Sequence, residues 1–157
     1  MRWPALAIGA LCLSCGMIPE SHGQVSDHAD LHGYKFTIRA EGDTCVLKYD
    51  GSSQKGQMVL VPRPPCYFLR RESSEPQSFP YQDTATKAAL IVMGSSISQE
   101  TRKRWNLPGD LICGEEIQGL LIKKQQIALS SRVLRKGVWC KDKGADEKDF
   151  WFFAHEK

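Results

Sequence analysis

Segments in which apolar and polar residues alternate recur along the chain after residue 33, and they restrict the fold more than any other feature. In "YKFTIRA", Tyr34, Phe36 and Ile38 alternate with polar residues, so an extended chain would place these three side chains on one face. This period of two residues is typical of a β-strand with one buried face. The other segments that fit short strands are "TCVLKYD", "QMVLVP", "CYFLRR", "AALIVMG", "DLICGEEIQ", "GLLIKK", "QIALSS" and "GVWCKD". The pattern predicts a mainly β fold built from an antiparallel sheet, as a sandwich or a barrel-like structure.

Residues 96–106 predict one short helix. Ser95 or Ser96 could cap its N-terminus, and the basic residues of "TRKR" fall near its C-terminus, where they suit the helix dipole. Pro108 and Gly109 would then end it. Before this helix, residues 72–87 are mostly small and polar and predict a long loop, of a kind that is often functional.

The last apolar run, "DFWFFAH", predicts a final strand. Such a strand would place Phe150 and Phe152 on one face, and Trp151 and Phe153 on the other. Residues 127–136 fit either a strand or one side of a short helix, because their apolar residues suit both periods.

The first 23 residues have the three parts of an export signal. Arg2 supplies a positive charge, residues 3–18 are apolar, and Ser21 and Gly23 are the small residues expected before a cleavage site. The motif "CLSC" offers an alternative, a lipid anchor on Cys15, although it fits a lipoprotein cleavage box poorly. The sequence therefore predicts a periplasmic or secreted protein. We expect residues 24–33 to form a flexible N-terminus and residues 34–157 to form a single domain.

Four cysteines follow the export signal: Cys45, Cys66, Cys113 and Cys140. An even number in an exported chain predicts two disulfides. Of the three possible connectivities, Cys45–Cys66 with Cys113–Cys140 is the sequence-local one, and each bond would stabilise the fold by about 3 kcal/mol through chain entropy. No pair has the short spacing of a zinc knuckle.

Residue types that carry catalysis are sparse after the export signal. "MGSSIS" lacks the glycines of a nucleophile elbow. "DHADLH" places His28 and His32 four residues apart but offers no third metal ligand. The adjacent Glu115 and Glu116 would point to opposite faces of a strand, so they cannot form a glycosidase pair together. We expect no catalytic site, no metal and no cofactor.

The surface chemistry instead favours binding to another protein. A formal net charge of +3 is small for a nucleic-acid-binding protein, and no later segment is apolar enough to span a membrane. Small exported β domains with disulfides commonly act through a loop or a face. The residues that suit such an interface are Phe79, Tyr81, Tyr67, Arg63 and Trp151.

We therefore expect a protein-binding module, such as an inhibitor or immunity-type protein that acts on a toxin or a cell-wall hydrolase. The alternative is a small carboxylate-dependent hydrolase or carbohydrate-active enzyme. In that case Glu115 or Glu116 would work with a distant carboxylate.

Overall fold

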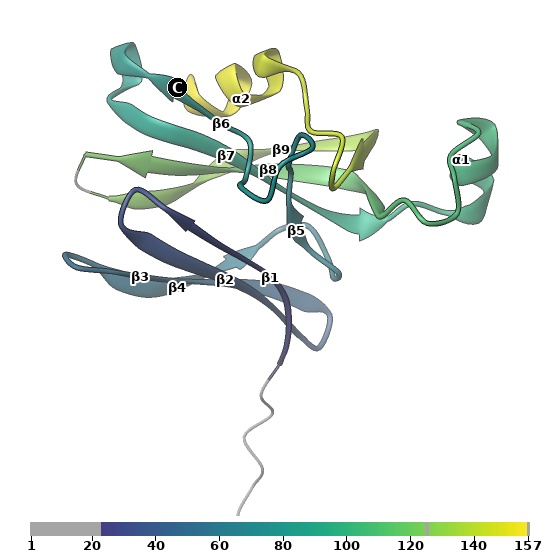
Figure 1. Cartoon of the computed structure of the whole chain (residues 1–157), viewed down its shortest axis with the longest axis horizontal. Coiled ribbons are helices and arrows are strands. Elements are labelled where there is room, and N and C mark those ends of the chain that lie inside the picture. Colours follow the sequence, from purple (N-terminus) through teal and green to yellow (C-terminus); the bar gives the residue numbers. More distant parts are fainter. Residues whose placement is uncertain (1–22, 125, 157) are drawn as a thin grey trace, which may run out of the picture.

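The computed structural model describes residues 23–124 and 126–156, and these residues form two antiparallel sheets packed face to face (Figure 1). The first sheet has the order β1 (Gln24–Leu31), β2 (Tyr34–Glu41), β3 (Thr44–Gly51) and β4 (Lys55–Leu60). The second has the order β5 (Tyr67–Phe68), β7 (Thr86–Ser96), β8 (Cys113–Lys123) and β9 (Ile127–Cys140), with β6 (Ser78–Tyr81) also paired to β7. The expectation of a mainly β fold with antiparallel sheets is confirmed, in its sandwich form.

The core between the sheets consists of side chains that alternate along the central strands. From the first sheet, Phe36, Ile38 and Leu47 are at most 1% exposed, and they share a cluster with Leu90 and Leu120 of the second. The apolar positions that alternate in "YKFTIRA" are therefore the inward positions of β2, as a half-buried strand requires.

A helix, α2 (Glu147–Ala154), covers the outer face of the second sheet, so the prediction of a final strand is wrong. Asp146 caps this helix by accepting a hydrogen bond from the backbone N–H of Lys148 at 3.2 Å. Helical spacing places Phe150 and Phe153 on one face, where both are fully buried against the sheet. A strand would have pointed these two side chains in opposite directions and left the outer face of the sheet without this apolar cover.

Residues 24–31 form β1, so the prediction that residues 24–33 are flexible is wrong. The segment looks polar because the outward face of β1 lies in solvent and because one buried side chain is Asp27. The carboxylate of Asp27 accepts two hydrogen bonds from the guanidinium of Arg70, at 2.6 and 3.0 Å. This buried ion pair fixes β1 of the first sheet to the chain that follows β5 of the second.

The predicted helix is present as α1 (Gln99–Arg104), and Ser98, rather than Ser95 or Ser96, caps it. The predicted loop at residues 72–87 is shorter than expected, because it contains β6 and the 3-10 helix η1 (Gln82–Thr84). Residues 127–136 belong to β9, which excludes the helical alternative.

Both expected disulfides, Cys45–Cys66 and Cys113–Cys140, occur in the described part of the chain. The first joins β3 to the segment before β5, and so it links the two sheets. The second joins the start of β8 to the end of β9. The predicted export signal lies outside the described residues, apart from Gly23. Among the helices that the structure describes, none is long and apolar enough to cross a bilayer.

Candidate partner-binding surfaces

The segment between β7 and β8, residues 97–112, projects from the sandwich and carries α1 (Figure 1). We call this segment the arm. The helix has the sequence QETRKR, without an apolar residue, and none of its side chains is buried. A helix that is polar on every side has no face to pack on a core. The sequence of α1 therefore explains why the arm lies away from both sheets.

A small apolar cluster at one end of the second sheet holds the base of the arm. Ile97, Leu107 and Leu111 pack there with the disulfide between Cys113 and Cys140. The backbone N–H of Ile97 donates a hydrogen bond to the carbonyl of Cys113 at 3.3 Å, so the two ends of the arm lie side by side.

Inside the arm, Arg102 fixes the chain that follows α1. Its guanidinium donates hydrogen bonds to the carbonyl of Pro108 at 2.7 Å and to that of Leu111 at 3.0 Å. The backbone N–H of Leu107 in turn donates to the carbonyl of Arg102 at 3.0 Å. Because Ser98 also caps the helix, both of its ends are held. The arm would therefore lose less entropy on binding than a flexible loop would.

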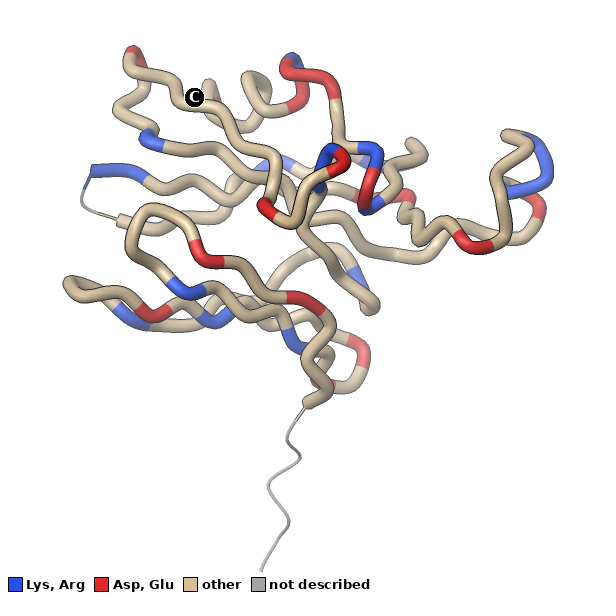
Figure 2. Tube along the Cα trace, viewed as in Figure 1, with Lys and Arg blue, Asp and Glu red and all other residues tan. Residues whose placement is uncertain are grey.

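The outer end of the arm presents Lys103, Arg104 and Trp105 to solvent. Figure 2 shows the basic residues of α1 at the far edge of the molecule. Trp105 is 61% exposed. Tryptophan and arginine are the residue types most enriched among the side chains that dominate the binding energy of protein interfaces. The arm thus combines a rigid backbone with side chains suited to a partner.

The residues predicted for an interface lie mainly around α2. Phe79, Tyr67 and Tyr81 are half-buried against the apolar cluster that α2 forms with the second sheet, and the rings of Phe79 and Phe150 are 4.9 Å apart. These three aromatics therefore serve the fold. Trp151, on α2, is 53% exposed and remains a candidate contact.

His155 ties the C-terminal end of α2 to η1. Its Nδ1 lies 2.8 Å from the carbonyl oxygen of Trp151, and its Nε2 lies 2.7 Å from the carboxylate of Asp83. The hydrogen bond with Asp83 raises the pKa of His155 above its ordinary value and lowers the pKa of Asp83. The ring of Trp151 stacks on the imidazole at 4.2 Å, and the ring of Tyr81 meets it edge-on at 5.3 Å. Burial, helped by the charge of Glu147, raises the pKa of Tyr81 to about 12.

Arg63, the fifth predicted interface residue, lies away from α2 and lines a polar depression. The residues that line it are Gly42, Asp43, Arg63, Pro64, Ser95, Ser96 and Glu115. The neighbouring Glu116 accepts hydrogen bonds from the hydroxyl of Ser95 at 2.6 Å and from Nε of Arg135 at 2.9 Å. Of the two adjacent glutamates, Glu115 therefore faces the depression and Glu116 serves a structural network.

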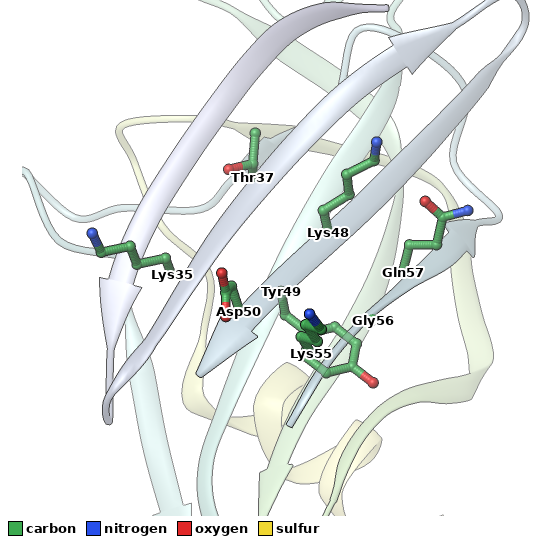
Figure 3. Close-up of a pocket in the computed structure, with 8 residues that line it drawn as sticks. All are labelled: Lys35, Thr37, Lys48, Tyr49, Asp50, Lys55, Gly56 and Gln57. Carbon is green, nitrogen blue, oxygen red and sulfur yellow. The ribbon is translucent and has the colours of Figure 1, made fainter. Parts of the chain in front are cut away.

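The outer face of the first sheet carries a second open depression (Figure 3). It is lined by Lys35, Thr37, Lys48, Tyr49, Asp50, Lys55, Gly56 and Gln57. The strand register places Asp30, Lys35, Asp50 and Lys55 in one row across the four strands. Acidic and basic side chains thus alternate along the row, as is typical of a solvated face.

His28 is exposed on β1, and His32 lies in the turn that follows, with a positive φ of 50°. Within the residues that the structure describes, no group of three or more His, Cys, Asp or Glu side chains is arranged to hold a metal ion. The four-residue spacing of the two histidines would suit a helix, but this segment is a strand.

Trp105 is not among the interface residues predicted from the sequence, although one signal points to it. The residues one turn before it, Thr101 and Arg102, are polar, so a helix ending there gives the tryptophan no apolar side chain on which to pack.

Comparison of the chain with known protein families, with curated proteins and with solved structures found no match.

Proposed function

We propose that this chain is an exported protein-binding module, periplasmic or secreted, that acts as an inhibitor or immunity-type protein on a toxin or a cell-wall hydrolase. The observation that carries the proposal is the arm, which holds a 61% exposed tryptophan on a backbone fixed at both ends. The sandwich supplies stability, and the arm supplies the contact with the partner.

The two disulfides support the proposed periplasmic or secreted location. Bonds such as Cys45–Cys66 and Cys113–Cys140 persist in oxidising surroundings outside the cytosol. The bond between β8 and β9 lies at the base of the arm, where it helps to keep the proposed contact surface ordered.

The alternative, a carboxylate-dependent hydrolase, has one observation in its favour. Asp43 and Glu115 line the same depression. Both side chains are exposed, whereas a glycosidase acid is usually kept protonated by an apolar pocket. Replacing Glu115 by Gln tests this alternative, because loss of a hydrolytic activity shown by the wild type would favour it over binding.

The test of the proposal compares two exposed tryptophans. The disulfide-intact protein and its Trp105→Ala and Trp151→Ala variants are immobilised and exposed to extract from the same cell compartment. We expect a retained protein whose recovery falls at least tenfold with Trp105→Ala, as for an interface hot spot worth more than about 1.4 kcal/mol. A tenfold fall with Trp151→Ala alone would instead place the contact on α2, where this second candidate residue lies. Recovery that is equal with all three baits would contradict a role for the arm.

A further inference from the structure

The outer end of the arm is shaped for a concave partner surface. Successive residues of a helix point about 100° apart around its axis. Lys103, Arg104 and the capping residue Trp105 follow one another at the end of α1, so their side chains spread in different directions from a narrow projection. A flat partner surface could contact only part of this set, whereas a cleft could contact all three.

The helical backbone excludes one common mode of inhibition. Peptides that imitate a protease substrate bind as extended strands, through their own backbone N–H and C=O groups. In the arm those groups are already used: the N–H of Arg102 donates to Ser98, and that of Trp105 donates to Thr101. Contact with a partner must therefore come from the side chains of the arm, because its backbone groups are not free to pair.

The side chains at this end define the chemistry of that site. Lys103 and Arg104 are exposed cations, and the ion pair between Arg104 and Glu100 is itself open to solvent, with both side chains more than 60% exposed. Exposed pairs of this kind are weak and exchange readily for a better partner. A complementary cleft therefore carries carboxylates, together with an apolar shelf for the indole ring of Trp105.

A glycoside hydrolase that cleaves peptidoglycan has this combination. Two carboxylates about 5–10 Å apart flank its scissile bond, and the surrounding cleft binds sugar rings. We infer that the arm enters the carboxylate-lined substrate cleft of such a muramidase, with Lys103 and Arg104 toward its acidic side chains and Trp105 in a sugar subsite. This inference rests on the proposed function and narrows its partner to one class.

Two other partners are less compatible with the arm. A membrane surface would require a larger apolar area than Trp105 supplies, because the other residues from 98 to 110 are polar apart from the half-buried Leu107 and the small Pro108 and Gly109. A nucleic acid would require a wider basic surface than two cations, in a chain whose formal net charge is +3.

The test measures inhibition of two purified muramidases with paired catalytic carboxylates, hen egg-white lysozyme and a phage lysozyme, on peptidoglycan by the disulfide-intact protein. We expect the wild type to inhibit at least one of them, and the inhibitor concentration needed to rise at least tenfold for Lys103→Glu/Arg104→Glu and for Trp105→Ala. The double variant Lys123→Glu/Lys124→Glu is the matched control, since it makes the same change in net charge at the end of β8, whereas the arm joins the start of β8. A chitin trisaccharide, which fills the cleft, should compete with the protein.

The possible results separate the inference from the proposed function. Absence of inhibition of both enzymes at a hundredfold excess overturns the muramidase assignment, and the Trp105-dependent recovery described above then decides whether the arm binds another protein. If inhibition falls with Trp105→Ala but not with Lys103→Glu/Arg104→Glu, the inference that the arm enters a carboxylate-lined cleft is overturned. The arm is then still the contact surface. Trp105-dependent binding to phosphatidylglycerol vesicles or to a single-stranded oligonucleotide, without inhibition, overturns the inference in favour of a membrane or a nucleic acid.

Discussion

Arg70 uses every donor of its guanidinium inside the protein. Two of its N–H groups bind the carboxylate of Asp27, and the other three donate to the carbonyls of Phe68, His28 and Ser74. Arg70 and Asp27 are 6% and 8% exposed. Removing one partner from such a pair leaves the other charge buried without compensation.

We therefore expect Arg70→Met to lower the free energy of unfolding by about 3–5 kcal/mol, measured by urea denaturation. The control is Arg104→Met, which removes the exposed pair with Glu100 and should change stability by less than about 0.5 kcal/mol. A loss for Arg70→Met as small as that of the control would contradict the part assigned to this pair in joining the sheets.

Gly119 allows α2 to lie close to β8. A Cβ atom at this position would be 2.5 Å from Cβ of Phe153, far inside van der Waals contact. Gly119→Ala should therefore lower the free energy of unfolding by about 1–3 kcal/mol, the usual range for an overpacked core, as measured by urea denaturation. The matched control is Gly109→Ala, where a Cβ atom would have no atom within 4 Å and where stability should stay within about 0.5 kcal/mol. Equal effects at the two positions would show that Phe153 does not pack on β8 as described.

The two helices α1 and α2 show what local sequence can and cannot predict. α1 was predictable because a serine cap, a polar body and a following proline agree on one helix. α2 is only two turns long, and four successive aromatic residues, Phe150 to Phe153, suit a strand as well as a helix. The capping residue Asp146 and the acidic first turn were the available helix signals. Which face is buried depends on the second sheet, which local sequence does not contain.

The same limit applies to β1 and to the arm. The charge of Asp27 made β1 look like a solvated tail, because its partner Arg70 is distant in sequence. The exposure of Trp105 likewise depends on the absence of a tertiary neighbour rather than on its own residue type. Of the interface residues predicted from the sequence, Trp151 is exposed. Phe79, Tyr67 and Tyr81 instead pack against the apolar cluster of α2 and the second sheet.

The C-terminal end of α2 should make stability depend on pH. Both ring nitrogens of His155 face acceptors, the carbonyl of Trp151 and the carboxylate of Asp83, and only the protonated imidazole can donate to both. Because the pKa of His155 is raised in the folded state, its contribution is fully present below the unfolded value of about 6.5 and is lost as pH rises through the raised value. The pKa of Asp83 is lowered, so its contribution is present above about 3.9 and is lost as pH falls through the lowered value.

We expect the free energy of unfolding to decrease as pH rises above about 6.5, and we expect His155→Gln to remove this part of the slope. Urea denaturation at several pH values measures the slope, and an NMR titration of the imidazole gives the pKa directly. Asp83→Asn, which removes the carboxylate that faces Nε2, should reduce the slope as His155→Gln does. An imidazole of His155 that titrates below 6.5 would contradict the assignment.

The two disulfides close loops of similar length but hold different parts of the protein together. Their sequence separations are 21 and 27 residues, so chain entropy assigns each about 3 kcal/mol of stability. Cys45–Cys66 links the two sheets, whereas Cys113–Cys140 packs with Ile97, Leu107 and Leu111 at the base of the arm. Removal of either disulfide should therefore cost similar stability, but a different part of the protein should open in each case.

We expect Cys45→Ala/Cys66→Ala and Cys113→Ala/Cys140→Ala each to lower the free energy of unfolding by about 3 kcal/mol. In brief trypsin digestion, the second variant should be cut first after Lys103 or Arg104, because its arm opens locally while the sandwich stays folded. The first variant should instead be digested only through global unfolding, with no early fragment ending at these residues. Mass spectrometry of the first fragments distinguishes the two courses, and early cleavage in the arm of both variants would show that the Cys113–Cys140 bond has no special part in holding it.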